Sequence, residues 1–134
     1  MSEIFEYGKN CIRYPQIRVK IITLGKEYPL EGYEYVRIDT GFDGPLLIPY
    51  DLFGRLCQDI ELFGKMRPII EFPNNEILKG RAANVEVEIG NKLIDTQAWT
   101  YPGCDEFLVG LEALNKFKIL LNGIDEFMEI CDNF

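Results

Sequence analysis

The chain has 134 residues, 47% of them hydrophobic, and is therefore expected to fold as one soluble domain with its own apolar core. Its 22 aspartates and glutamates outnumber its 14 lysines and arginines and give a net charge of −8, which argues against nucleic acid as a partner. No apolar run approaches the roughly 20 residues that a membrane-spanning helix needs, so no membrane segment is expected.

Residues 1–16 are predicted as an N-terminal extension, and residues 17–134 as the domain itself. The extension carries acidic residues where a signal peptide needs a basic start and a continuous apolar stretch. We therefore expect a cytoplasmic protein.

Alternating apolar side chains predict two strands at the start of the domain. The first covers residues 17–23, and a turn at 24–27 follows it. The pattern resumes from residue 31 and ends at Ile38, directly before the tripeptide Asp39-Thr40-Gly41. The second strand therefore presents this tripeptide at its end.

A dense turn follows the tripeptide, because residues 41–45 contain two glycines and a proline. The short apolar run 46–48 is then ended by Pro49. A short helix is predicted over residues 50–56, with Asp51 near its start.

Three hairpins are predicted in the rest of the chain, each with turn residues between two apolar strands. They are expected at 68–79 with Asn74 and Asn75 at the tip, at 85–99 with a turn at 90–91, and at 118–130 with a turn at 122–123. A buried strand at 107–109 and a short helix at 111–117 precede the last hairpin. Many short strands and two short helices indicate a mainly-β barrel or sandwich.

The tripeptide is the strongest candidate for chemistry. The chain has no histidine, which excludes Ser-His and Cys-His pairs and leaves carboxylates as the natural catalytic groups. Two carboxylates about 3 Å apart share a proton, so that one activates a water while the other protonates a carbonyl oxygen. Asp95-Thr96-Gln97 lacks the glycine and lies within a predicted strand, so we interpret it as structural. The second carboxylate is therefore expected from a second copy of the chain.

The four cysteines, Cys11, Cys57, Cys104 and Cys131, are far apart in the sequence and form no Cys-x-x-Cys motif. This spacing gives no support to a metal site. We expect reduced, mostly buried thiols, with a contact of Cys11 and Cys131 at an interface as the alternative.

The segment from Val36 to Pro49 resembles the retropepsins, the single-lobe, dimeric branch of the aspartic proteases. It is especially similar to a group of prokaryotic retropepsin-like proteins that have Asp-Thr-Gly, an aromatic residue, a small turn and a leucine-rich strand ending in proline. Residues 107–114, Phe-Leu-Val-Gly-Leu-Glu-Ala-Leu, resemble the second landmark of that family. The order of the hairpins also fits, and the similarity covers residues 17–121.

The resemblance implies a closed β-barrel, a homodimer with the active site on its two-fold axis, cleavage of extended peptides, and no metal or cofactor. Asp39 matches the catalytic aspartate of the family. Thr40 matches the residue that locks the two active-site loops together across the dimer. Gly41 matches the glycine whose carbonyl lies along the substrate backbone. The hairpin with Asn74 and Asn75 at its tip takes the position of the flap over the substrate.

The chain also departs from the viral retropepsins. Phe42 stands where they have a small residue, and Leu111 stands where they have an arginine that pairs with an acid at the position of Asp43. The flap tip lacks glycines and contains Pro73, and residues 122–134 do not match the viral C-terminal interface strand.

Several alternatives remain open from the sequence. Asp43 either caps an Asx-type turn, the interpretation we prefer, or contacts substrate. Asn74 and Asn75 form either an ordinary hairpin tip or a flap that grips a peptide. Three aromatic residues are more simply core than pocket lining, namely Trp99, Tyr101 and Phe107. For the whole chain, the alternatives are a noncatalytic dimeric module that binds extended peptides and a monomeric barrel that binds a small apolar ligand.

Overall fold

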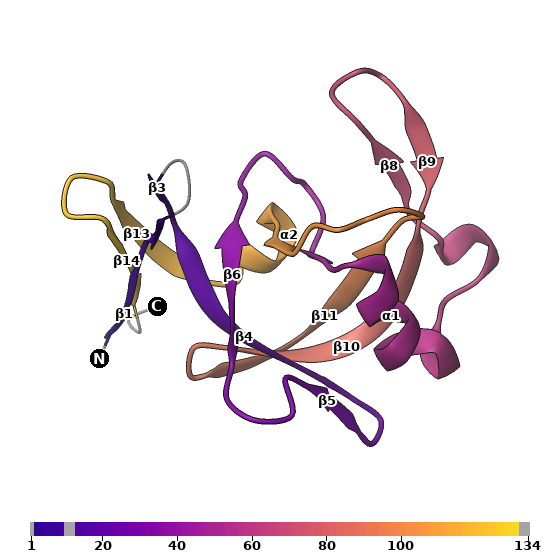
Figure 1. The fold of residues 1–134 in the computed structure, drawn as a ribbon, viewed down its shortest axis with the longest axis horizontal. Helices are drawn as coiled ribbons and strands as arrows, with labels where there is room; N and C mark the ends of the chain where they lie inside the picture. The colour runs from indigo at the N-terminus through magenta and orange to yellow at the C-terminus, as the bar shows by residue number, and fades with distance from the viewer. Residues whose placement is uncertain (1, 10–12, 132–134) are drawn as a thin grey trace.

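The computed structural model describes residues 2–9 and 13–131 (Figure 1). Half of the chain is in strands and only 14% in helices. The strands are β1 Ser2–Glu6, β2 Gly8–Lys9, β3 Arg13–Tyr14, β4 Gln16–Thr23, β5 Lys26–Tyr28, β6 Glu34–Ile38, β7 Leu46–Leu47, β8 Ile69–Glu71, β9 Ile77–Lys79, β10 Arg81–Ile89, β11 Lys92–Thr100, β12 Leu108–Val109, β13 Lys118–Asn122 and β14 Phe127–Cys131. The helices are α1 Tyr50–Cys57 and α2 Leu111–Leu114, with 3₁₀ turns η1 Gln58–Ile60 and η2 Gly64–Met66.

Six strands form a closed barrel in the order β10, β11, β7, β12, β6 and β4. The antiparallel pairing of β4 with β10, from Ile22 opposite Glu86 to Val19 opposite Ile89, closes the ring. Strand β5 extends β4 outside this ring. The predicted mainly-β fold, a closed barrel with one or two short helices, is confirmed.

The barrel core follows from the alternation seen in the sequence. Ile17, Val19 and Ile21 of β4 are completely buried, whereas the residues between them are partly exposed. Helix α1 adds Leu52, Phe53, Leu56 and Cys57, whose spacing places them on one face of the helix. Burial of these side chains provides the main driving force for packing α1 and the strands around one core.

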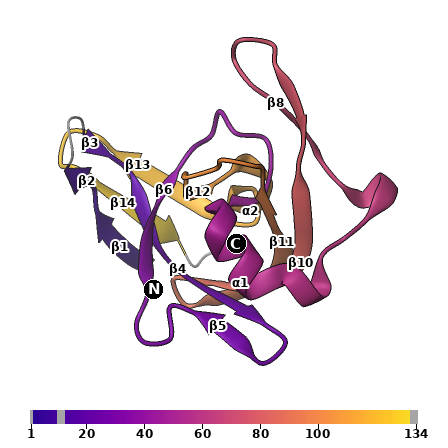
Figure 2. The same ribbon diagram turned by 45° about the vertical axis from the view of Figure 1, so that its right-hand side comes forward.

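A second, three-stranded sheet joins the two ends of the chain in the order β1, β14, β13 (Figure 2). Ser2 lies opposite Cys131 and Glu6 opposite Phe127. Phe5, Met128 and Ile130 point from this sheet into the main core. The described part of the predicted N-terminal extension is therefore integrated into the fold.

The hairpins expected at 85–99 and 118–130 form as β10–β11 and β13–β14. Two local predictions differ from the structure. The expected turn at 24–27 is shorter, because Lys26 already begins β5 after a positive φ of 72° at Gly25. The second helix ends at Leu114 rather than Phe117, where Lys116 and Phe117 donate hydrogen bonds to carbonyls three residues earlier. In the part of the chain that the structure describes, no helix has the length and apolar character to cross a bilayer.

Candidate active site

Strand β6 ends at Ile38 and places Asp39 at the rim of the barrel. The Asp39 backbone N–H donates to the carbonyl of Val109 at 2.9 Å, and the Asp39 carbonyl accepts from Phe42 N–H at 3.2 Å. The side-chain oxygen Oδ1 accepts from the Gly41 N–H at 2.9 Å. This Asx-type turn fixes the direction of the carboxylate, and no described residue donates to its other oxygen.

Gly41 is suited to this turn for a steric reason. A Cβ atom at this position would lie 3.2 Å from Asp39 Oδ1, closer than an ordinary van der Waals contact. A side chain here would press on the oxygen that the Gly41 N–H holds in place. Thr40 and Gly41 are both exposed, while Asp39 is half-buried, so the tip of the loop is accessible to a second molecule.

The segments 36–49 and 107–114 lie side by side because β12 is inserted between β6 and β7. Strand β12 runs parallel to β6, with Leu108 opposite Arg37 and Val109 opposite Ile38, and antiparallel to β7. The insertion of β12 between β6 and β7 brings residues 39–45 against the start of α2. The sequence predicted both segments and did not predict their pairing.

Three backbone hydrogen bonds hold the loop of residues 39–45 on the segment that follows β12. They are Gly110 N–H to Pro45 O at 2.6 Å, Leu111 N–H to Phe42 O at 2.8 Å and Glu112 N–H to Gly44 O at 3.2 Å. A Cβ on Gly110 would come within 2.1 Å of the Gly44 carbonyl oxygen. Gly110 is therefore required for the close approach that fixes the loop.

Aromatic residues form a second, smaller core beneath this loop. Phe42 packs edge-to-face on Trp99, with ring centroids 5.9 Å apart and an interplanar angle of 78°. The cluster is centred on three buried side chains, Leu47, Cys104 and Leu108. Trp99 and Tyr101 are partly buried and pack against it, whereas Phe107 packs on the main core and also lines a surface hollow. Phe42 thus serves as an anchor for the loop.

The predicted role of Asp43 as a turn cap is not found. Asp43 is exposed, and its side chain makes no hydrogen bond or ion pair with any residue that the structure describes. Asp39 makes the Asx-type turn instead, because its Oδ1 is the oxygen that the Gly41 N–H reaches. Asp43 remains available to solvent or to a ligand.

The hairpin predicted at 68–79 forms as β8 and β9, with Asn74 and Asn75 in the turn. Asn75 has φ of 69°, a conformation that asparagine tolerates, and Asn74 Oδ1 accepts from Glu76 N–H at 3.0 Å. The hairpin projects away from the barrel in both views (Figures 1 and 2). Ile69 and Ile77 are 70% and 62% exposed, so the hairpin offers apolar side chains to a ligand.

One aromatic contact connects the hairpin to the small core under the loop. Phe72 packs on Tyr101 with ring centroids 5.0 Å apart and an interplanar angle of 85°. Burial raises the pKa of Tyr101, and the nearby Cys104 and Glu106 add to this effect. The hydroxyl of Tyr101 donates to Glu106 at 3.2 Å and stays protonated near neutral pH. The contact limits the freedom of the hairpin in this conformation.

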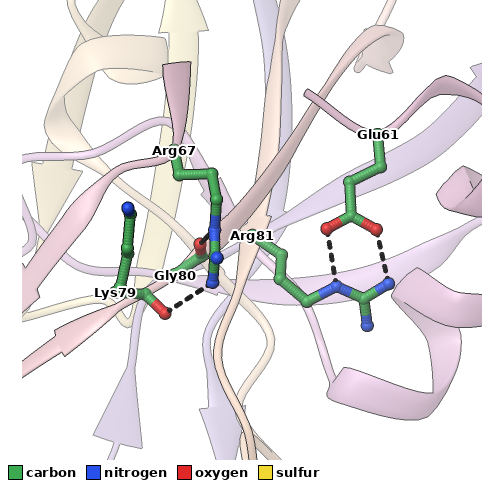
Figure 3. A network of polar contacts seen from close by, with 5 residues as sticks. All are labelled: Glu61, Arg67, Lys79, Gly80 and Arg81. Atoms are coloured by element: carbon green, nitrogen blue, oxygen red, sulfur yellow. Dashed lines mark hydrogen bonds and ion pairs between the residues drawn. The ribbon is translucent and has the colours of Figure 1, made fainter. Parts of the chain in front are cut away.

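Two arginines make polar contacts near the base of the hairpin, Arg67 with the hairpin itself and Arg81 with the segment that precedes it (Figure 3). Arg67 donates to the carbonyls of Gly80 at 2.9 Å and Lys79 at 3.3 Å. Arg81 donates twice to Glu61, at 2.8 and 2.6 Å. The pKa of Glu61 is lowered, mainly by this hydrogen bonding. Sequence reasoning missed these arginines, because only the fold brings Glu61 next to Arg81.

Asp95 and the cysteines lie apart from this loop in the sequence. Asp95 lies within β11 opposite Glu86, in agreement with its structural interpretation. Among the described residues, no group of three Cys, Asp or Glu side chains is arranged to hold a metal ion. Cys57 and Cys104 are buried and free, whereas Cys11, and with it the alternative contact to Cys131, lies outside the described residues.

No protein-family model matches the chain. The chain is 29% identical over 109 residues to an uncharacterized protein of Archaeoglobus fulgidus, and the alignment covers 80% of this chain and 84% of that protein. The relationship extends over most of both chains and carries no functional information.

Proposed function

We propose that the protein is an aspartic endopeptidase that acts as a homodimer, with Asp39 of each protomer forming a catalytic dyad. The observation that carries this proposal is the geometry of the Asp39-Thr40-Gly41 loop. One oxygen of Asp39 is held by the Gly41 N–H, the tip of the loop is exposed, and the loop is fixed from behind by the segment after β12. A preorganised carboxylate at an open surface is what a symmetric dyad requires.

The proposed chemistry follows from placing two such carboxylates together. At about 3 Å separation both cannot be charged, so the pair holds one proton. The charged carboxylate takes a proton from the water molecule that attacks the peptide carbonyl carbon. The protonated carboxyl group donates its proton to the carbonyl oxygen. Because the pair must hold one proton, activity is expected to favour acidic to mildly acidic pH. No metal or cofactor is needed for this step.

The proposed substrate is an extended peptide in the protein's own compartment, which we take to be the cytoplasm. The β8–β9 hairpin lies on the loop's side of the molecule and exposes Ile69 and Ile77. Its backbone can add hydrogen bonds to an extended peptide, as in strand-addition recognition. Thr40 and Asp43, both exposed, are the residues of the loop best placed to meet the partner copy or the peptide.

The test is cleavage of an unfolded protein substrate across a range of pH by the wild type and by two asparagine variants. Asp39→Asn is expected to abolish cleavage with unchanged fold and oligomeric state, and pepstatin-like inhibitors are expected to block the wild type. Asp95→Asn is the matched control, because Asp95 has the same Asp-Thr sequence context and is exposed within a strand. Equal turnover by Asp39→Asn and the wild type would remove the assignment.

A noncatalytic dimeric module that binds extended peptides is the second candidate. The contact of Phe72 with Tyr101 and the presence of Pro73 favour it, because both restrict opening of the hairpin over a bulky substrate. Light scattering measures the oligomeric state and so distinguishes the two dimeric candidates from a monomeric barrel. A strict monomer would exclude the dyad. A dimer that binds peptides at every pH tested and never cleaves them would establish the second candidate.

A further inference from the structure

A cavity of about 790 Å³ lies between the β4–β5 hairpin and helix α1. Its volume falls within the range of about 300–1,000 Å³ that small-molecule sites occupy. Strand β5 lies at the lower end of the molecule in both views, whereas the loop between β6 and β7 lies at the upper end (Figures 1 and 2). The cavity is therefore separate from the proposed active site.

Two hydrogen bonds tie the walls of this cavity together. Thr23 Oγ1 donates to the carbonyl of Leu56 at 3.4 Å, and Lys26 Nζ donates to the carbonyl of Arg55 at 3.1 Å. Both acceptors belong to the last turn of α1, where carbonyls have no partner within the helix. These contacts join the hairpin to the last turn of α1 at one wall of the cavity.

Apolar side chains form most of the lining of the cavity. Leu52 and Leu56 of α1 are 3% and 7% exposed and form its floor, and Tyr28 and Pro29 line the side of the hairpin. Leu30 also lines the cavity and is 80% exposed. A leucine so open to water beside an apolar floor gains contacts when an apolar chain enters.

The charges around the cavity oppose the charge of the whole protein. The chain carries −8, yet the cavity is lined by two cations, Lys26 and Arg55, and one acid, Glu27. Glu27 pairs with Lys20 at 3.8 Å, and Lys26 lies 3.8 Å from the largely exposed Asp59. Arg55 forms no ion pair with any residue in the described part of the chain. Arg55 is exposed and lines the cavity, and it also borders a neighbouring hollow that Asp51 and Asp59 line.

We propose that this cavity binds a small molecule made of an apolar chain that ends in a carboxylate, such as a medium-chain alkanoate. The chain occupies the floor of Leu52 and Leu56 and covers Leu30, and the carboxylate faces Arg55. The arginine fork is suited to hold a carboxylate at a partly exposed rim. This site does not depend on the proposed peptidase activity.

The test is titration calorimetry of the full-length wild type with decanoate, decanol and decylammonium. Saturable binding at one site is expected for decanoate, with weaker binding of decanol and the weakest binding of decylammonium. Chemical-shift changes confined to β4, β5 and α1 are expected in the NMR spectrum with decanoate. Equal affinities for the three compounds would remove the role of the carboxylate, and shifts around residues 39–45 would place the ligand elsewhere.

Exposed leucines provide a matched pair of variants that leave the core intact. Leu30→Glu removes an apolar contact and adds a negative charge at the mouth, and is expected to weaken decanoate binding at least about tenfold. Leu24→Glu is the control, because Leu24 is 84% exposed on the same hairpin and does not line this cavity. Equal weakening by both variants would contradict the proposed position of the ligand.

The cation is tested in the same way. Arg55→Gln is expected to weaken decanoate binding about threefold to fivefold and to leave decanol binding unchanged. Lys65→Gln serves as the control, since Lys65 is an exposed cation in η2 outside the cavity. If only a peptide with a free C-terminal carboxylate bound, and no alkanoate did, the proposal of a small apolar ligand would be wrong.

Discussion

Replacing Glu61 with glutamine is expected to destabilise the fold by about 2 kcal/mol at neutral pH. The side chains of Glu61 and Arg81 are only 12% and 20% exposed and share hydrogen bonds of 2.8 and 2.6 Å. The Arg81 guanidinium also lies 5.1 Å from the ring centre of Tyr50 and 4.9 Å from that of Phe53. Moving the guanidinium into water after the substitution would break these ring contacts.

The magnitude follows from what glutamine keeps and loses. Each charge-assisted hydrogen bond contributes about 1.5–3 kcal/mol. Glutamine keeps one acceptor for Arg81, but its NH₂ group turns toward the other guanidinium donor, so one of the two bonds is lost. In a domain of this length, a loss of about 2 kcal/mol lowers the melting temperature by about 8 °C.

The effect of Glu61→Gln depends on pH. Hydrogen bonding by Arg81 lowers the pKa of Glu61, against the opposing effect of burial. A carboxylate with a lowered pKa in the folded state stabilises the fold above its unfolded pKa, and this stabilisation is lost as pH falls through the folded value. The difference between wild type and variant is therefore complete at neutral pH and shrinks below about pH 4.

Urea unfolding followed by the fluorescence of Trp99, the single tryptophan, measures both quantities. Asp59→Asn is the control, because Asp59 is 84% exposed and lies 3.8 Å from Lys26, so its removal is expected to change stability by less than about 0.5 kcal/mol. Equal stability of Glu61→Gln and the wild type at neutral pH would refute the reasoning. So would a difference that persists undiminished at about pH 3.

Three further predictions concern the loop, the hairpin and a buried thiol. Gly110→Ala is expected to cost about 3 kcal/mol, since its Cβ would meet the Gly44 carbonyl oxygen at 2.1 Å, and an unchanged melting temperature would contradict this. Phe72→Ala is expected to speed amide exchange in β8 and β9 without lowering global stability by more than about 1 kcal/mol, because it removes the contact with Tyr101; unchanged exchange in the hairpin would argue against that contact. Burial raises the pKa of the Cys57 thiol to about 12, so iodoacetamide at about pH 8 is expected to modify it only after unfolding, as mass spectrometry would show; rapid native labelling would refute this.

Local pattern predicted the parts of the fold in which burial alternates along a strand. Strands β4 and β10 have one face in the barrel core. The alternation of apolar and polar residues in their sequences therefore matches the alternation of buried and exposed side chains. The hairpin of β8 and β9 was predicted from its turn, because asparagine at 75 tolerates the positive φ that the turn needs. These features depend on residues close together in the chain.

Long-range pairing could not be predicted in this way. Strand β12 has two residues, too few for any periodicity, and its partners β6 and β7 lie about seventy and about sixty residues earlier in the chain. The closing pair of β4 and β10 and the joining of β1 to β14 also depend on residues far apart in sequence. Such contacts are selected by how the whole set of apolar faces packs.

The candidate active site also combines features that the sequence predicted with contacts that it did not predict. The sequence indicated that Asp39 ends a strand and that a turn follows it. It did not indicate that Oδ1 of Asp39 accepts from the Gly41 N–H, that Phe42 anchors the loop on Trp99, or that Arg67 holds the base of the hairpin. Each of these contacts requires side-chain directions that only the assembled barrel defines.

The register of β6 and β12 shows which residue follows β12 where Asp39 follows β6. Ile38 lies opposite Val109, so the residue that follows β12 in the place where Asp39 follows β6 is Gly110. Gly110 carries no carboxylate, and a Cβ there would lie only 2.1 Å from the Gly44 carbonyl oxygen. The related position within one chain is therefore closed to any side chain. A second carboxylate for the proposed dyad therefore cannot come from this position of the same chain.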